Sequence, residues 1–168
     1  MLRRVFSFIK MKRERCNVAN ISTVSAKTVL KDNVLVEVEA RGHKVIVDEP
    51  LNLGGTDKGM NPVELLLSAL GACQAIVART YAKKFEIDLQ QFWVELEGDI
   101  DLDGFLGKSD VRPGFSSIRY TFHIETDAPK EKVAAYKEYI EAHCPVGDTI
   151  ANPVSLSSAT VIVENAVK

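Results

Sequence analysis

The chain has 168 residues, enough for one domain with a hydrophobic core but too few for two domains of ordinary size. Its residues are 46% hydrophobic and 26% charged with a net charge of −2, which gives no basic surface of the kind that binds nucleic acid. No apolar run reaches the roughly 20 residues that span a bilayer, so we expect no membrane segment. Three cysteines do not resemble the disulfide framework of a small secreted domain, and we expect a cytoplasmic protein.

The first 26 residues form a basic and partly apolar extension. Its apolar part, residues 5–9, is short for the core of a signal peptide, and no convincing cleavage site follows. We expect residues 1–26 to be poorly ordered and Cys16 to take no part in function. A translation start at Met11 and an organellar targeting segment are the alternatives. The folded domain is expected at residues 27–168.

A three-stranded meander is predicted for residues 28–48, where apolar and polar residues alternate as in half-buried strands. Asp32-Asn33 and Arg41-Gly42 supply the turns between these strands.

A long helix is predicted after the Gly-rich loop that follows the meander. Asn61 is its expected N-cap, Pro62 occupies its first position, and Glu64 completes a capping box. The helix is apolar on nearly every side as far as Tyr81, which is typical of a helix that is buried all round. A domain of this size can hardly enclose such a helix alone, so a second chain is expected to cover part of it.

The rest of the chain predicts two strands, a second helix and a last strand. Residues 92–98 and 115–126 are the two strands, joined by a polar loop. The second helix is expected to open at Asp127, with Pro129 just inside, and to end at Pro145. Residues 153–166 close the chain as a strand. The order βββ-α-ββ-α-β indicates an α+β fold, and scattered histidines and cysteines give no metal or cofactor site.

Two cysteines stand out by their surroundings. Cys73 lies within the apolar run "LLLSALGACQA", and Cys144 begins "CPVGDT" at the end of the second predicted helix. Taken singly, each is a small apolar side chain, and Cys73 is far from the helix N-terminus that would lower its pKa. Cys144, at a helix end before proline, is expected near the surface.

The stretches "MNPVELLLSALGACQA" and "YIEAHCPVGDTIANPVSLSSATVIV" together resemble the OsmC/Ohr family of osmotically inducible and organic hydroperoxide resistance proteins, in its OsmC-like branch. The resemblance covers about residues 28–168. It implies an intertwined homodimer around a long buried central helix, with active sites at the subunit interface. It also implies thiol chemistry: Cys73 attacks a hydroperoxide, its sulfenic acid condenses with Cys144, and an external dithiol reduces the disulfide.

The chain departs from the family pattern in the groups that would assist Cys73. The family has a glutamate ten residues before the first cysteine, where this chain has Val63. Glu64 is one residue later, and nine residues correspond to about 900° of helical rotation, so Glu64 points away from Cys73 and its capping role accounts for it. Arg41 is the candidate cation for the thiolate, with Lys31 and Arg112 as alternatives.

These observations predict a thiol-dependent peroxidase that reduces organic hydroperoxides. Cys73 would be the peroxidatic residue, Cys144 the resolving one, and Arg41 and Glu64 further candidate site residues. The alternative is a non-enzymatic protein on the same fold, either redox-responsive or binding a small lipid-like ligand. A third possibility is that both thiols have a purely structural role.

Overall fold

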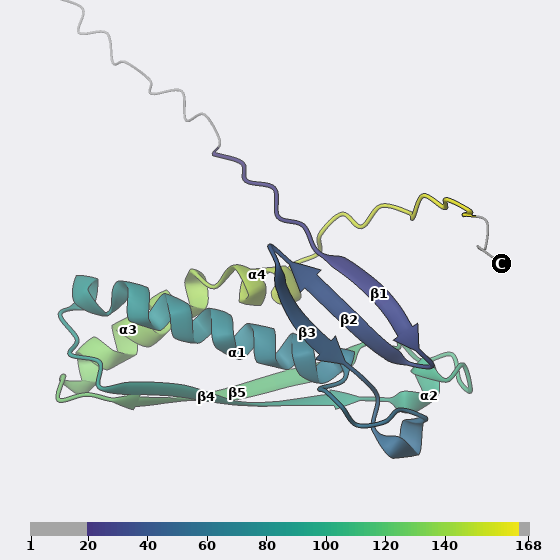
Figure 1. Cartoon of the computed structure of the whole chain (residues 1–168). Coiled ribbons are helices and arrows are strands. Elements are labelled where there is room, and N and C mark those ends of the chain that lie inside the picture. The colour runs from purple at the N-terminus through teal and green to yellow at the C-terminus, as the bar shows by residue number, and fades with distance from the viewer. Residues whose placement is uncertain (1–19, 165–168) are drawn as a thin grey trace, which may run out of the picture.

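The computed structural model describes residues 20–164, so Cys16 and most of the predicted N-terminal extension lie outside the described part. Residues 20–26 form no helix or strand there. In chain order the elements are β1 (Lys27–Asp32), β2 (Leu35–Ala40), β3 (His43–Val47), the 3-10 helix η1 (Leu51–Leu53), α1 (Pro62–Tyr81), the 3-10 helix η2 (Ala82–Phe85), β4 (Gln91–Ile100), α2 (Leu102–Phe105), β5 (Phe115–Glu125), α3 (Lys130–Ala142) and α4 (Pro145–Ala151) (Figure 1).

The predicted meander is confirmed as a three-stranded antiparallel sheet in the order β1-β2-β3. Its valines pair across the strands, Val36 with Val47 and Val38 with Val45. The β2–β3 turn needs two residues with positive φ, and Arg41 (53°) and Gly42 (83°) supply them. The sequence therefore specified both the strands and this turn.

The loop between β3 and α1 is organised by one buried carboxylate, Asp48. Its Oδ2 accepts hydrogen bonds from the amide of Thr56 (3.0 Å), the hydroxyl of Thr56 (2.6 Å) and the amide of Lys58 (3.2 Å), while Oδ1 accepts from the amide of Glu49 (2.9 Å). The Thr56 hydroxyl and these amides hold the pKa of the Asp48 carboxyl below its usual range. Four donors to one ionised group fix the path by which the chain enters α1.

Helix α1 is the centre of the fold and begins where the capping box predicts. Asn61 Oδ1 accepts from the Glu64 amide (2.9 Å), and Glu64 Oε2 accepts from the Asn61 amide (2.8 Å). The helix runs along the β4–β5 hairpin (Figure 1) and contacts β4, α3 and α4. Gly71 permits the close approach to β4, because a Cβ there would come within 2.8 Å of Leu96.

The core lies between α1, α3 and β4. Tyr136 and Ile140 of α3 are completely buried against Ala78 of α1, and the Tyr136 hydroxyl donates to the Ala78 carbonyl oxygen. This contact holds α3 against the C-terminal part of α1.

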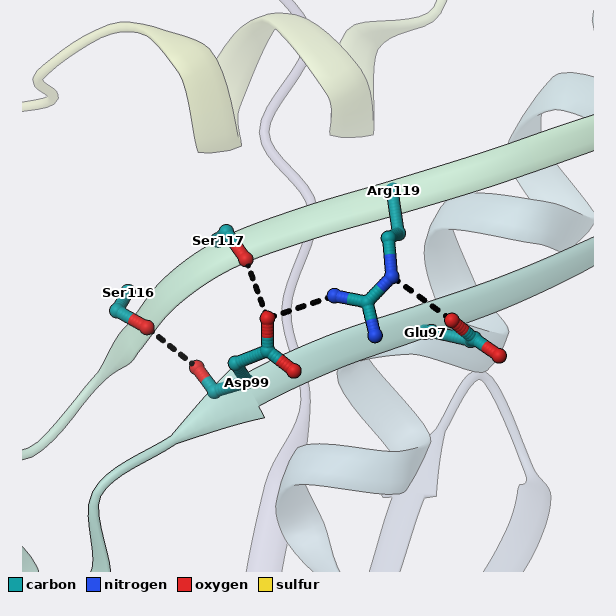
Figure 2. Close-up of polar contacts among 5 residues, drawn as sticks. All are labelled: Glu97, Asp99, Ser116, Ser117 and Arg119. Atoms are coloured by element: carbon teal, nitrogen blue, oxygen red, sulfur yellow. Dashed lines mark hydrogen bonds and ion pairs between the residues drawn. The ribbon is translucent and has the colours of Figure 1, made fainter.

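The β4–β5 hairpin has an apolar inner face and a charged outer face. On the outer face Arg119 donates to Glu97 (2.8 Å) and to Asp99 (2.6 Å), and Ser117 donates to the same Asp99 oxygen (2.7 Å) (Figure 2). These side chains are more than half exposed, so they contribute little to stability.

Two helix boundaries differ from the predicted ones. Helix α3 begins at Lys130 with Pro129 as its N-cap, so Asp127 does not open it. Pro145 does not merely end a helix but starts α4, with Cys144 as N-cap. Proline at the first helical position removes no hydrogen bond, because that amide has no partner within the helix.

The predicted last strand is wrong for the single chain. Residues 153–164 form no strand, and they extend away from the body of the molecule (Figure 1). Leu156 is 94% exposed, and Val161, Ile162 and Val163 are exposed as well. The alternating pattern is suited to a strand, but strand formation needs a neighbouring strand, and none pairs with this segment within residues 20–164.

Helix α1 is not enclosed on all sides by its own chain, which agrees with the expectation that a domain of this size can hardly enclose it alone. Leu70, Gly71 and Val77 are buried, whereas Ile76 on another face is 66% exposed. By length and composition, residues 62–85 are apolar enough to cross a bilayer, so the expectation that no run is long enough is wrong. In this fold the helix is the core helix, packed on β4, α3 and α4.

Candidate active site

The structure brings Cys73 and Cys144 together. Cys73 is half-buried near the middle of α1, and Cys144 is 1% exposed at the N-cap of α4. Helices α1 and α4 are in contact, and this makes the two side chains neighbours. Cys73 raises the pKa of Cys144 through a hydrogen bond and through its charge. Both thiols are free. The expectation that Cys144 lies near the surface is wrong, because its side chain is buried where α4 packs on α1.

The environment of Cys144 favours the protonated thiol. Burial raises the pKa of Cys144, and the neighbouring Cys73 raises it further. The Gly147 amide donates to Cys144 Sγ (3.3 Å) and acts in the opposite direction, but more weakly. Cys144 is therefore a poor nucleophile in its resting state.

A cavity of about 360 Å³ opens on Cys144. Its wall is formed by α1, β5 and the segment from the end of α3 through α4. The lining residues are Leu70, Gln74, Ile118, Tyr120, Glu141, Ala142, Cys144, Gly147, Asp148, Ile150, Ala151 and Asn152. Cys144, although only 1% exposed, is one of these residues, whereas Cys73 is not.

Gln74 is a buried polar residue of this cavity that the sequence analysis did not single out. Its side chain is 2% exposed, and its Oε1 is buried without a hydrogen-bond partner among the described residues. A buried amide oxygen with no partner is costly. One signal was present in the sequence, because Gln74 interrupts the apolar run around Cys73. Its contact with a cavity depends on α4, which the sequence did not predict.

Tyr120 and Glu141 form a second polar group in the cavity wall. The Tyr120 hydroxyl donates to Glu141 Oε1 (3.2 Å), and Lys137 donates to Glu141 Oε2 (2.8 Å) from outside the cavity. Burial, and then the charge of Glu141, raise the pKa of Tyr120. The Tyr120 hydroxyl therefore stays protonated and serves as a hydrogen-bond donor.

The other two predicted site residues are not brought to this cavity within the described chain. Arg41 occupies the exposed β2–β3 turn, and Glu64 is held at the N-terminus of α1 by the capping box. The capping interpretation of Glu64 is confirmed. Neither residue lines the cavity next to Cys144.

The alternative cations differ in their position. Lys31 pairs with Glu37 on the three-stranded sheet (3.3 Å). Arg112 lines a neighbouring groove of about 540 Å³ that shares Ile118 and Ile150 with the cavity next to Cys144, and its Nη2 donates to the Phe115 carbonyl oxygen (3.0 Å). Arg112 therefore lies at a groove next to this cavity, whereas Lys31 and Arg41 line neither the groove nor the cavity. Among residues 20–164, no cluster of three or more His, Cys, Asp or Glu side chains could hold a metal ion.

Several solved structures share the fold of this chain. The OsmC-like protein of Mycoplasma pneumoniae aligns with a TM-score of 0.68 and 18% identity, over 77% of this chain and 88% of its own. The organic hydroperoxide resistance protein OsmC of Legionella pneumophila aligns with a TM-score of 0.57 and 21% identity, over 79% and 91%. The organic hydroperoxide resistance protein of Elizabethkingia anophelis, with thiocyanate bound, aligns with a TM-score of 0.57 and 19% identity, over 78% and 89%. At these identities the likeness concerns the fold.

Sequence comparison gives the family. No curated protein sequence matches this chain. The family model described as OsmC-like protein matches residues 55–159, a range that includes α1, the β4–β5 hairpin, α3, α4 and both cysteines. The chain belongs to the OsmC-like protein family.

Proposed function

We propose that this protein is a thiol-dependent peroxidase that reduces organic hydroperoxides. The observation that carries the proposal is the juxtaposition of Cys73 and Cys144, 71 positions apart in sequence (144 − 73) and neighbours in the fold. Two further findings support it: the chain belongs to the OsmC-like family, and two proteins that share its fold are described as organic hydroperoxide resistance proteins.

The unequal exposure of the thiols divides their roles. Half-buried Cys73, as thiolate, attacks the distal oxygen of a hydroperoxide, the O–O bond breaks, and the alkoxide leaves as alcohol after taking a proton. Cys73 is thereby oxidised to a sulfenic acid. Cys144 then attacks the Cys73 sulfur, water leaves, and a disulfide forms. A buried resolving thiol suits this order, because it stays protonated until its partner is oxidised.

We further propose that the working form is a homodimer. Ile76 on α1 and five apolar side chains of residues 153–164 are exposed in the single chain, and a second copy would cover them. A dimer is also the way in which Arg41 or Glu64 could reach a thiol pair, since neither lies at the cavity of its own chain. The molar mass from sedimentation equilibrium tests this: twice that of the chain is expected, and a monomer at micromolar concentration would contradict it.

The peroxidase proposal is tested by dithiol-coupled consumption of cumene hydroperoxide. Cys73→Ser is expected to lose all activity. Cys144→Ser is expected to complete a single turnover and to accumulate a sulfenic acid on Cys73, which a dimedone-type reagent traps. Equal residual activity in both variants, or turnover without either thiol, would refute the assignment.

The cation and the carboxylate are tested in the same assay. The activities of Arg41→Ala, Arg112→Ala and Lys31→Ala are compared at saturating dithiol. The pH dependence of Cys73 alkylation is then measured in each variant, and the cation that stabilises the thiolate is the one whose loss shifts alkylation to higher pH. Glu64→Gln separates catalysis from capping. If Glu64 is only a cap, the variant loses at most about 1 kcal/mol of stability and keeps full activity.

A second candidate function is binding of a small lipid-like ligand. It is favoured by an apolar groove of about 660 Å³ between β5 and α3, lined in part by Phe122, Ile124, Val133 and Ala134, with Lys130 and Lys137 at its edge. Such a groove matches a hydrophobic chain with an acidic head. Binding of a fluorescent fatty acid that survives both Cys73→Ser and Cys144→Ser, without peroxidase activity in the unaltered protein, would favour this candidate.

A further inference from the structure

The groove that contains Arg112 lies beside the cavity next to Cys144 but is a separate site. Its volume is about 540 Å³, within the range of about 300–1,000 Å³ that is typical of small-molecule sites. Neither cysteine lines it, and it shares with the cavity next to Cys144 only Ile118 and Ile150. The groove is formed by the first two turns of α1, the loop before β5, the start of β5 and the end of α4.

The walls of this groove are mostly apolar and are reached from solvent. Leu66 is 40% and Ile150 37% exposed, and the other three apolar side chains of the wall are half-buried. Covering such side chains with an apolar molecule releases water and is favourable. The five apolar lining residues are Val63, Leu66, Phe115, Ile118 and Ile150.

Arg112 is the only charged residue among the described residues that line the groove. It forms no ion pair with a carboxylate of residues 20–164. The hydroxyls of Ser116 and Ser117 both donate to Asp99, at 3.1 and 2.7 Å (Figure 2). The Asp99 carboxylate in turn accepts from Arg119 (2.6 Å). The groove therefore carries one positive charge that no ion pair within the described chain neutralises.

The guanidinium of Arg112 is held in place by the backbone beside it. Its Nη2 donates to the Phe115 carbonyl oxygen (3.0 Å), which uses only one of its N–H groups. Gly114 leaves room for it, because a Cβ there would lie 3.3 Å from Nη2 and 3.5 Å from Nε. A planar guanidinium that is fixed in this way still has donors for both oxygens of a carboxylate.

We propose that this groove binds a small carboxylic acid with an apolar body, with the carboxylate on Arg112 and the body against Val63 and Leu66. The inference goes beyond the peroxidase function proposed above, because neither cysteine lines the groove and no redox step is involved. The site also differs from the candidate lipid groove between β5 and α3, which has Lys130 and Lys137 at its edge.

The kind and number of charges favour a carboxylate over other ligands. A phosphate ester carries up to two negative charges, and the groove offers a single cation for them. A carboxylate carries one charge, and its two oxygens match the fork of the guanidinium. An amine would be repelled by Arg112, and a neutral apolar molecule would leave the guanidinium without a partner.

Titration calorimetry on the full chain tests the class of ligand. Octanoate is the probe, octanamide has the same chain without the charge, and octylamine has the opposite charge. We expect octanoate to bind on the order of tenfold more tightly than octanamide, because its hydrogen bonds are charge-assisted, and octylamine to bind most weakly. Butyrate should bind more weakly than octanoate, by up to roughly fourfold for each methylene removed from the groove.

Two results of this titration would overturn the proposal. Equal affinities for octanoate and octanamide would show that the charge of Arg112 is not used. Absence of binding by all of the probes would show that the groove is closed in the intact protein, as it would be if a second copy filled it.

Variants of Arg112 test its role directly. Arg112→Gln should weaken octanoate on the order of tenfold and leave octanamide unchanged, while Arg112→Lys, which keeps the charge but not the fork, should fall between them. Lys108→Gln is the matched control, since it removes one positive charge from the same loop outside the groove. Equal losses in Arg112→Gln and Lys108→Gln would mean that only net charge matters, and the site would be refuted.

A second set of variants locates the bound octanoate. Val63→Glu places a carboxylate on the wall of the groove, where it should pair with Arg112 and exclude octanoate; a negative charge in the first turn of α1 suits the helix dipole, and circular dichroism checks the fold. Lys130→Gln with Lys137→Gln should leave the affinity unchanged. A loss in this double variant but not in Arg112→Gln would place octanoate between β5 and α3 and contradict the proposal.

The outcome is separable from the peroxidase proposal. Cys73→Ser should bind octanoate as tightly as the unaltered protein, because Cys73 does not line the groove. A chain without peroxidase activity that still binds octanoate through Arg112 would refute the first proposal and uphold this one. Loss of binding in Cys73→Ser would tie the ligand to the thiols and overturn the separate site.

Discussion

The two cysteines are chemically identical, and the comparison between their surroundings explains how one side chain type can serve two roles. Cys73 lies in the middle of a long helix and is partly open to solvent. Cys144 lies at the first turn of a short helix, is 1% exposed, and has a raised pKa because it is buried. The two thiols therefore differ in how accessible they are to a reagent.

The largest expected effect is on alkylation of the two thiols. In the native reduced protein, iodoacetamide should modify Cys144 on the order of 10²-fold more slowly than Cys73, because burial hinders approach and favours the unreactive protonated thiol. Peptide mass spectrometry over a time course measures both rates, and unfolding in urea should make them equal. Comparable rates in the native state would remove the distinction between the thiols.

The next effect concerns the contact that holds α3 against α1. Tyr136→Ala should lower the free energy of unfolding by about 3–5 kcal/mol, because it empties a completely buried site. Tyr136→Phe keeps the packing and loses only the hydrogen bond to the Ala78 carbonyl oxygen, which costs about 1 kcal/mol. Urea denaturation measures both. In Tyr136→Ala, alkylation of Cys144 should also approach the rate at Cys73; a buried Cys144 in that variant would show that α4 holds its place without α3.

The raised pKa of Cys144 predicts a pH dependence of stability. Above the ordinary thiol pKa of about 8.5, the unfolded chain loses this proton while the folded chain keeps it, so stability falls as pH rises until the folded pKa is passed. The slope for one group is at most about 1.4 kcal/mol per pH unit. Urea denaturation at pH 7 and pH 10 should show a smaller alkaline loss in Cys144→Ser than in the unaltered protein. The buried tyrosines titrate in both proteins and cancel in the comparison.

The smallest effect is expected far from the thiols. Arg119→Ala removes the two ion pairs that Arg119 makes on the outer β4–β5 face and should leave the free energy of unfolding nearly unchanged, since exposed pairs are screened by water and salt (Figure 2). Alkylation of both cysteines should not change. A changed ratio of the two alkylation rates would mean that the outer face of the hairpin influences the site.

Much of the fold was predictable because its signals are local. The capping box at Asn61 and Glu64, the Arg41-Gly42 turn and the alternating strands of the meander depend on residues close in sequence, and the structure confirms each of them. The pairing of Cys73 with Cys144 was expected only through the resemblance to a family. No local pattern links residues that are joined by the packing of α4 on α1.

The errors have two physical causes, a helix too short to recognise and a strand without a partner. Helix α4 is only 7 residues long, too short to produce a convincing periodic pattern, and Pro145 at its start was taken for a helix end. The position of Cys144 and the cavity with Gln74 both depend on that helix, so both were missed. The final strand was predicted from an alternating pattern that is real, but a strand also needs a partner, which sequence alternation does not provide.

The charge of Asp48 has a consequence for the behaviour of the chain in acid. Because this carboxylate binds its four donors as an anion, its contribution is present above the ordinary carboxyl pKa of about 3.9 and is lost as pH falls through the lowered folded value. Protonation would release the loop that links the small sheet to α1 while the uncharged contacts between α1 and α3 persist. Acidification should therefore unfold the three-stranded meander at a higher pH than the core formed by α1 and α3.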